Sequence, residues 1–138
     1  MICLGNICRS PLAEGILRKL TLNKNIIVDS AGTSSYHIGE NPDSRMILTA
    51  RKFSIDISNL KARKFSTSDF DKFDLIYAMD SSNYKDIIKL ARNNKDCKKV
   101  KLISKNDIPD PFYENMESFE KVYFLLENAC KKIIETIE

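Results

Sequence analysis

A cysteine and an arginine near the start of the chain are separated by five residues and followed by serine and proline, in the string CLGNICRSP over residues 3–11. Ser10 is a favourable helix N-cap and Pro11 suits the first helical position, so the loop is predicted to lead directly into a helix. The first amides of a helix are unpaired, and the helix dipole adds partial positive charge there. The spacing therefore predicts an anion-binding loop.

The side chains of this loop suggest covalent phosphoryl chemistry. The guanidinium of Arg9 can hold two oxygens of a phosphate. The same positive field favours the thiolate of Cys3, and a thiolate beneath a bound phosphate is a nucleophile aimed at phosphorus. Gly5 is expected to permit a tight backbone path, and Asn6 tolerates a left-handed conformation.

Composition leaves few other classes open. A chain of 138 residues is expected to form one domain over 1–138, and its net charge of +3 is too small to indicate nucleic-acid binding. No apolar run approaches the ~18 residues of a membrane span, so no membrane insertion is predicted. No secretory signal is recognisable, and a cytoplasmic monomer is expected.

The four cysteines do not follow the spacing of a metal site. Cys3, Cys8, Cys97 and Cys130 fit no zinc template, and His37 is the only histidine, so neither a metal nor a Ser-His-Asp triad is expected. The glycines form no Walker loop. No cofactor is predicted, and Cys130 is interpreted as a small buried hydrophobe.

Hydrophobic periodicity indicates helices that alternate with short apolar strands. The helices are expected at 11–22, 42–53, 82–91 and 118–138, with a helical turn near Phe70, and the strands at 26–28, 73–79 and 100–103. The polar segment 93–99 is expected to be a connection, and 54–68 to be irregular. Such alternation predicts an α/β fold of three layers, with a parallel sheet covered on both faces. The loops after its strands, which carry Cys3, Ser30, Asp80 and Asp110, should then meet at one edge.

Five stretches resemble segments of the low-molecular-weight protein tyrosine phosphatases, in the order of that family: CLGNICRSP, DSAGT (29–33), GENPDSR (39–45), FDLIYAMD (73–80) and PDPF (109–112). The resemblance implies a central four-stranded sheet in the flavodoxin-like order 2-1-3-4, with a truncated first strand. It implies hydrolysis of a tyrosine-phosphorylated protein or a small aryl phosphate, with inorganic phosphate as the product and no cofactor.

The resemblance also implies roles for individual residues. Cys3 would form a phosphocysteine, Arg9 would bind the phosphoryl oxygens, Ser10 would hydrogen-bond the thiolate, and Asp110 would be the general acid and then the base. The phosphate-binding residues would be Leu4, Gly5, Asn6, Ile7, Cys8, Arg9 and Ser10. Asn6, Ser10, Ser30 and Asp80 would support the loop.

Other observations leave alternatives open. Tyr36, Phe112 and Tyr113 can line a slot for a phenyl ring, with His37 at its rim, but ordinary loop packing explains them too. Asp110 can equally belong to a plain turn, and Asp107 is a weaker candidate for the acid.

Three departures from the family pattern are visible. Only two residues precede Cys3, from which we expect that the start is misassigned and that Met1 stands inside a strand. Asn59 is expected to stand where many members have a histidine that braces the loop, and to hold the loop less firmly. The segment between Cys97 and Asp110 is short for the family.

Three other activities compete with tyrosine phosphatase. An arsenate reductase of this fold needs further cysteines in relay positions, and Cys97 and Cys130 lie far apart. A phosphoarginine phosphatase of this type carries threonine where Ile7 stands. A phosphotyrosine-binding module would need neither Cys3 nor Asp110. We also expect Cys3 and Cys8 to form a disulfide under oxidation, the alternative being that Cys8 only packs beneath the loop.

Overall fold

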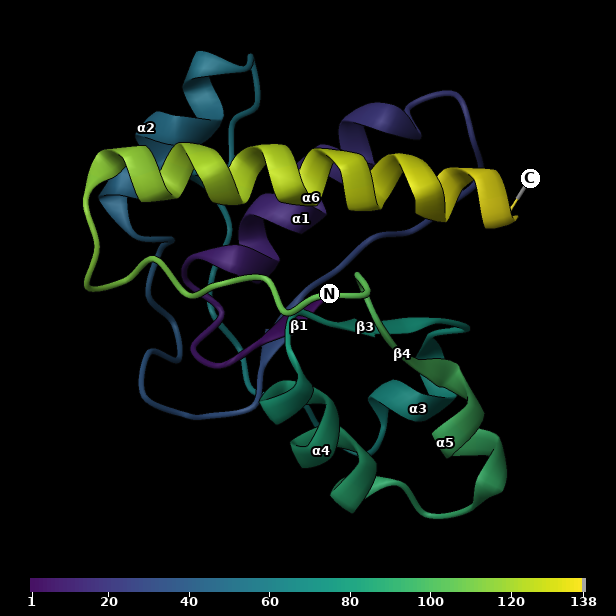
Figure 1. Ribbon diagram of the computed structural model, residues 1–138. Coiled ribbons are helices and arrows are strands. Elements are labelled where there is room, and N and C mark those ends of the chain that lie inside the picture. The colour runs from purple at the N-terminus through teal and green to yellow at the C-terminus, as the bar shows by residue number, and fades with distance from the viewer. Residues whose placement is uncertain (138) are drawn as a thin grey trace.

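The computed structural model describes residues 1–137 and shows a parallel sheet between two layers of helices (Figure 1). The strands pair in the order β2-β1-β3-β4. They are β1 (Ile2–Cys3), β2 (Ala31–Gly32), β3 (Ile76–Ala78) and β4 (Val100–Leu102). One face is covered by α1 (Arg9–Leu20), α2 (Ser44–Lys52) and α6 (Met116–Ile137), and the other by α3 (Asp69–Lys72), α4 (Ser81–Leu90) and α5 (Asn94–Lys99). The predicted fold class and strand order are confirmed.

The two residues of β1 contribute to opposite cores, because successive side chains of a strand point to opposite faces. Ile2 packs in the cluster that includes Phe70 and Ile87, on the side of α3, α4 and α5. Cys3 packs in the cluster that includes Leu12 and α6. The strand that carries the candidate nucleophile is therefore held from both sides of the sheet.

The long C-terminal helix presents the predicted apolar stripe to the core. Phe119, Val122, Leu126 and Cys130 are all at most 1% exposed. Burial raises the pKa of the Cys130 thiol to about 12, which keeps it protonated. The interpretation of Cys130 as a small buried hydrophobe is confirmed.

The prediction of a strand at 26–28 is wrong. Ile27 is 86% exposed, and the ladder instead pairs Ala31 with Ile2 and Gly32 with Cys3. A strand exists only where a neighbour offers hydrogen bonds, and β1 offers them beside Ala31–Gly32. The strand expected at 73–79 is likewise shorter and covers Ile76–Ala78.

The segment 93–99, predicted to be a connection, forms the helix α5 instead. The side chain of Asn93 accepts a hydrogen bond from the Asp96 amide at 2.9 Å and caps the helix. An asparagine followed by several good helix formers is a usual start signal for a helix, and it outweighed the polar composition.

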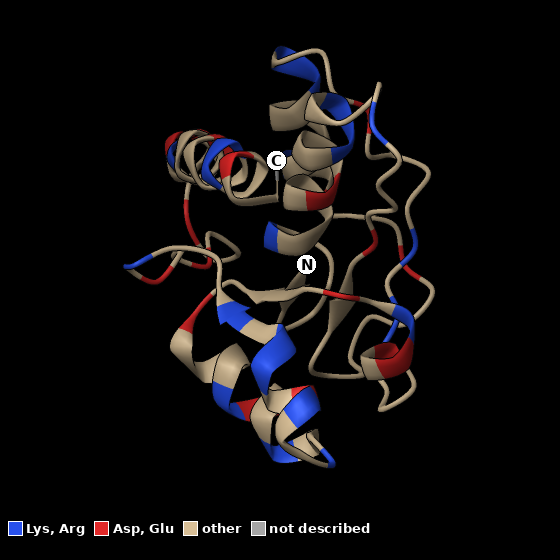
Figure 2. Cartoon of the chain, turned by 90° about the vertical axis from the view of Figure 1, so that its right-hand side faces the viewer, with Lys and Arg blue, Asp and Glu red and all other residues tan. Residues whose placement is uncertain are grey.

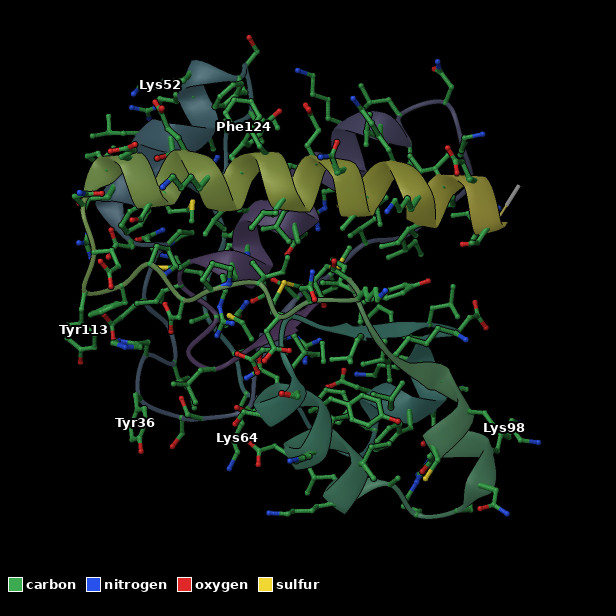
Figure 3. The ribbon with its side chains drawn as sticks, viewed as in Figure 1. Tyr36, Lys52, Lys64, Lys98, Tyr113 and Phe124 are labelled. Carbon is green, nitrogen blue, oxygen red and sulfur yellow. The ribbon has the colours of Figure 1, made fainter. Side chains whose placement is uncertain are left out.

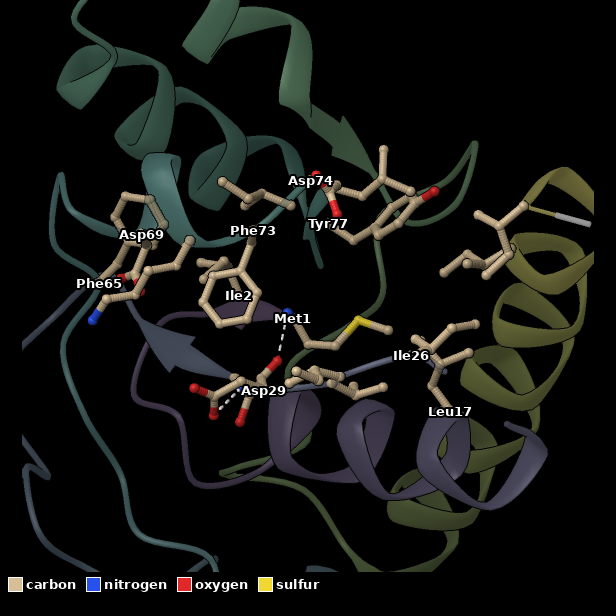
Figure 4. A pocket seen from close by; sticks show the side chains of 18 of the residues that line it. Met1, Ile2, Leu17, Ile26, Asp29, Phe65, Asp69, Phe73, Asp74 and Tyr77 are labelled. Atoms are coloured by element: carbon tan, nitrogen blue, oxygen red, sulfur yellow. Dashed lines mark hydrogen bonds between the residues drawn. The ribbon is translucent and has the colours of Figure 1, made fainter. Parts of the chain in front are cut away.

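A cavity of about 520 Å³ lies at the amino ends of β1 and β3 (Figure 4). Its lining includes Met1, Leu17, Ile26 and Phe73. The Met1 ammonium donates to the carbonyl oxygen of Asp29 at 3.0 Å, and burial lowers the pKa of that ammonium. Parallel α/β sheets bind ligands at the carboxyl ends of their strands, so this cavity is not the expected place for phosphoryl chemistry.

Lysine and arginine positions, blue in Figure 2, are frequent along the helices α4 and α5. Lys85, Lys89, Lys95 and Lys98 are exposed there. Lysines outnumber acidic residues on α4 and α5, so this part of the surface carries a net positive charge. No helix among residues 1–137 is long and apolar enough to span a membrane.

Candidate active site

The loop after β1 enters α1 earlier than the sequence predicted. The helix begins at Arg9 with Cys8 at the N-cap position, so neither Ser10 as N-cap nor Pro11 as first helical residue is correct. The Ser10 hydroxyl instead lies 3.0 Å from the Cys3 sulfur and accepts a hydrogen bond from Asn6 Nδ2 at 2.7 Å. A hydroxyl used in this way is not available to cap the helix.

The carbonyl oxygens of the loop point into the surrounding protein. Three of them accept hydrogen bonds from neighbouring amides at 2.8–2.9 Å: Thr33 donates to Cys3, Ser34 to Leu4 and Asp43 to Ile7. These three carbonyl oxygens are therefore satisfied by residues outside the loop. An anion-binding cradle at this loop stays a prediction, with which these outward-facing carbonyls are compatible.

Asn6 and Gly5 have different parts in the shape of the loop. Asn6 has φ 58°, so its left-handed conformation is confirmed. Gly5 is important for space rather than for an unusual φ, because an added Cβ would lie 2.9 Å from Cδ2 of His37. The missing side chain lets the His37 ring approach the loop.

Replacing Gly32 with alanine is expected to damage phosphate binding. A Cβ at Gly32 would lie 2.7 Å from the carbonyl oxygen of Leu4 and 3.2 Å from the Asn6 amide nitrogen, both backbone atoms of the loop. We expect a loss of about 1–3 kcal/mol in unfolding free energy, with weaker inhibition by inorganic phosphate. Gly15→Ala is the control, because its Cβ would meet only the side chains of Ile55 and Ile57. Equal phosphate affinities in the two variants would contradict the prediction.

Arg9 is buried and surrounded by acceptors. It is 2% exposed; Nη1 donates to Asp80 Oδ2 at 2.6 Å and to the carbonyl oxygen of Ile108 at 2.8 Å. Its Nη2 lies 3.7 Å from Asp110 Oδ2. Burial works to lower the pKa of Arg9, but Cys3, Asp80 and Asp110 outweigh burial and raise it. The guanidinium therefore stays charged and fixed in orientation beside the loop.

A pocket of about 270 Å³ opens above the loop. Its lining residues are Cys3, Leu4, Gly5, Ile7, Cys8, Arg9, Tyr36, His37, Asp110, Phe112 and Tyr113. Tyr36 and Tyr113 project outward from the molecule at the pocket's rim, 78% and 94% exposed (Figure 3). The ring of Phe112 lies 6.2 Å from His37 and 5.0 Å from Tyr113, centre to centre. The four predicted slot residues thus border one opening.

The remaining predicted residues lie beneath the pocket or away from it. Ser30 accepts from Asn6 Nδ2 at 2.9 Å, under the loop. Asp107 accepts from the Ser81 amide and hydroxyl, each at 3.0 Å, and does not line the pocket, so Asp110 is the acid candidate with the better position.

Asn59 does not brace the loop, contrary to the expectation. It is exposed, while the carbonyl oxygen of the Asn6 side chain accepts from the backbone amide of Arg63 at 3.0 Å. A backbone donor on the 54–68 segment therefore fills the position for which a side chain was predicted.

Sequence reasoning missed two charged residues near the site. Arg45 donates from Nη2 to the carbonyl oxygen of Phe112 at 2.7 Å and lies over the Phe119 ring, so it anchors the loop that carries Asp110. Glu14 is 2% exposed and accepts from the Ser30 hydroxyl at 2.6 Å. The spacing of Ser10, Glu14 and Arg18, four residues apart on one helix face, is the signal that could have identified Glu14.

Comparison with known proteins identifies the family of this chain. The family model "Low molecular weight phosphotyrosine protein phosphatase" matches residues 1–138. The human protein of that name is 41% identical over 97% of this chain and 91% of its own, and the chicken protein 40% identical over the same shares. This chain therefore belongs to the low molecular weight phosphotyrosine protein phosphatase family.

Solved structures show the same fold. A protein tyrosine phosphatase from Entamoeba histolytica, crystallised with Hepes in its active site, has a TM-score of 0.93 and 35% identity, covering 99% of this chain and 93% of its own. Vibrio vulnificus Wzb in complex with benzylphosphonate has a TM-score of 0.90 and 30% identity, covering 98% and 94%.

Proposed function

We propose that this protein hydrolyses phosphotyrosine through a phosphocysteine intermediate. One observation carries the proposal: the Cys3 sulfur, the Arg9 guanidinium and the Asp110 carboxylate border one pocket whose floor is the anion-binding loop. A nucleophile, a phosphate clamp and an acid are the three groups that such a reaction needs.

The first step forms the covalent intermediate. The Cys3 thiolate attacks phosphorus, the bond from phosphorus to the tyrosyl oxygen breaks, and Asp110 gives its proton to the leaving oxygen. The loop amides and Arg9 hold the three other phosphoryl oxygens, where negative charge is concentrated in the transition state. Ser10, 3.0 Å from the sulfur, stabilises the thiolate with its hydroxyl proton.

The second step releases inorganic phosphate. A water molecule attacks the phosphocysteine from the side that the tyrosyl group has left, and the carboxylate of Asp110 takes its proton. The sulfur–phosphorus bond breaks, the electrons return to sulfur as the thiolate, and the Ser10 proton again stabilises that charge. Water is the co-reactant of this second step, and its oxygen leaves in the inorganic phosphate.

The rim favours an aromatic leaving group. Phe112 and the exposed rings of Tyr36 and Tyr113 form apolar walls against which a phenyl ring can pack. Wzb of Vibrio vulnificus was crystallised with benzylphosphonate, an aromatic ring on a phosphonate, which supports this class of substrate. We therefore propose aryl phosphates, including phosphotyrosine in proteins, as substrates.

A panel of four compounds tests the proposal. We expect hydrolysis of phosphotyrosine and para-nitrophenyl phosphate, with little activity on phosphoarginine or arsenate. Ile7, an apolar lining residue, suits an aryl group, and Cys130 is buried against the Ala13 carbonyl oxygen, away from the pocket. If phosphoarginine is hydrolysed faster than phosphotyrosine, or arsenate is reduced in a thiol-dependent reaction, the proposed activity is wrong.

Cys8 is expected to protect the oxidised enzyme. Peroxide should take two electrons from the Cys3 thiolate to give a sulfenic acid; the Cys8 thiol then attacks that sulfur, a disulfide forms and water leaves. Burial raises the pKa of Cys8, with Asp43 and Cys3 adding to the effect, so Cys8 is protonated at rest and must give up its proton, which leaves in the water, as its sulfur attacks Cys3. Phosphate should slow the inactivation, and a thiol reductant should restore the wild-type enzyme.

The Cys8→Ser variant should lose activity to peroxide but recover poorly, because nothing traps the sulfenic acid before further oxidation. Cys97→Ser, which changes a cysteine outside the pocket, is the control and should recover like the wild type. Two results together would show that Cys8 only packs beneath the loop. They are full recovery of activity by Cys8→Ser and the absence, by mass spectrometry, of a Cys3–Cys8 linked peptide in the oxidised wild type.

A further inference from the structure

Glu14 is a buried carboxylate at one end of a chain of hydrogen bonds that finishes at the nucleophile. The Ser30 hydroxyl donates to Glu14 Oε1 at 2.6 Å, and Asn6 Nδ2 donates to both Ser30 Oγ at 2.9 Å and Ser10 Oγ at 2.7 Å. Ser10 Oγ lies 3.0 Å from the Cys3 sulfur. The proposed chemistry assigns no task to Glu14, although burying a charge costs free energy unless it has partners.

The donors and acceptors in this series of hydrogen bonds allow only one assignment of which group donates at each step. An ionised carboxylate can only accept, so the Ser30 proton goes to Glu14, and Ser30 Oγ is left to accept from Asn6. Asn6 Nδ2 can only donate, so Ser10 Oγ accepts from it. The one remaining Ser10 proton then points to the sulfur, where a donor stabilises the thiolate.

The opposite direction would remove that donor. If the Asn6 amide were flipped, its oxygen would attract the Ser10 proton away from Cys3. The oxygen of the flipped amide would also attract the Ser30 proton. Ser30 Oγ and Glu14 Oε1 would then lie 2.6 Å apart with no proton between them. The Arg63 amide, which donates to Asn6 Oδ1 at 3.0 Å, disfavours the flip from the other side.

From this geometry we infer that Glu14 is a positioning residue for phosphoryl transfer, acting through Ser30 and Asn6 to make Ser10 a hydrogen-bond donor to the Cys3 thiolate. The inference rests on the proposed role of Cys3 as nucleophile. What is new is that Glu14, which does not contact Cys3, determines that Ser10 donates its hydrogen bond to the Cys3 sulfur.

The charged groups around the Glu14–Ser30–Asn6–Ser10 hydrogen bonds allow a test, because two mechanisms predict opposite changes in the ionisation of Cys3 when Glu14 is removed. Glu14 is faced by Arg18 at 2.6 Å, by the Met1 ammonium and by Asp29, and Cys3 is faced by Arg9. Burial raises the pKa of Glu14, which the hydrogen bond from Ser30 and the charge of Arg18 oppose. Acting only through space, a negative charge at Glu14 disfavours the thiolate, so its removal would ease ionisation of Cys3. Acting through the hydrogen bonds, its removal would hinder ionisation.

The experiment compares the pH dependence of Cys3 alkylation by iodoacetamide in the wild type, Glu14→Gln and Glu14→Leu, with the absorbance of the thiolate as a second readout. For Glu14→Leu we expect the midpoint to rise by about one pH unit, a tenfold change in ionisation, as for loss of a hydrogen bond to a charged group. For Glu14→Gln we expect a smaller rise, because its carbonyl oxygen can still accept from Ser30. The kcat for para-nitrophenyl phosphate should fall more than KM changes.

Two further variants distinguish positioning from stability. Asp96→Leu is the control, because Asp96 is also a carboxylate that is 2% exposed and paired with an arginine, Arg92. It lies in α5, away from the hydrogen bonds to Cys3. This variant should therefore have a lower melting temperature and an unchanged alkylation midpoint. In a Ser30→Ala background, Glu14→Leu should cause no further rise of the midpoint, because the hydrogen-bond connection is already broken and only the through-space effect, which lowers the midpoint, remains.

An unchanged or lowered midpoint in Glu14→Leu, or the same shift with and without Ser30, would overturn the inference while leaving the proposed function intact. Absence of phosphatase activity in the wild type, with Cys3 still alkylated and its midpoint still raised in Glu14→Leu, would instead count against the proposed function alone.

Discussion

The Cys3→Ser variant is expected to show no turnover of para-nitrophenyl phosphate above background while it still binds inorganic phosphate or vanadate. A serine hydroxyl is a far weaker nucleophile than a thiolate at neutral pH. The cradle itself depends on the loop amides and on Arg9, which is held by Asp80 and Ile108 and does not need the sulfur. Binding is measured by calorimetry, and turnover by release of nitrophenolate.

The matched control is Cys97→Ser, because Cys97 is a free cysteine that does not line the pocket. This control should keep wild-type turnover. Near wild-type turnover by Cys3→Ser would exclude the phosphocysteine mechanism. Loss of both turnover and phosphate binding would mean that the sulfur also shapes the cradle, contrary to the hydrogen-bond pattern of the loop carbonyls.

The fold could be predicted from the sequence because its strongest signals are local. The periodic stripe of α6 and the loop that leads into α1 both depend on neighbouring residues, and both are present in the structure. The extent of the strands could not be predicted in the same way. Ile26, Ile27 and Val28 have the composition of a strand, but pairing with β1 occurs at Ala31–Gly32. Strand ends depend on partners distant in sequence, which composition does not reveal.

The same distinction applies to the candidate site. Cys3 and Arg9 belong to one loop, so their spacing alone indicated an anion site. Arg45, by contrast, acts on the Asp110 loop through the carbonyl oxygen of Phe112, 67 residues further along the chain. A long-range contact from a side chain to a backbone oxygen leaves no motif, since the acceptor has no residue identity. Glu14 was overlooked for a similar reason, because its partner Ser30 lies 16 residues further along the chain, just before β2.

The Asp110→Asn variant is expected to slow hydrolysis by roughly a hundredfold or more for poor leaving groups, in the range that general acids typically contribute. Asn has nearly the same shape and can keep the contact of the Asp110 side chain with the Phe112 amide, now 3.1 Å, so the loop should stay in place. What it lacks is a proton that it can give to the leaving oxygen. The loss should therefore shrink along a series of aryl phosphates as the leaving phenol becomes more acidic.

The series is measured as kcat/KM for five or six substituted phenyl phosphates, in the wild type, Asp110→Asn and a control, Asp107→Asn. The control changes the neighbouring carboxylate, which accepts from Ser81 outside the pocket, and should follow the wild-type dependence on leaving group. A steeper dependence only in Asp110→Asn is the expected signature of a missing proton donor. An equal loss across the whole series would show that the carboxylate acts another way, for example by orienting Arg9, whose Nη2 lies 3.7 Å from it.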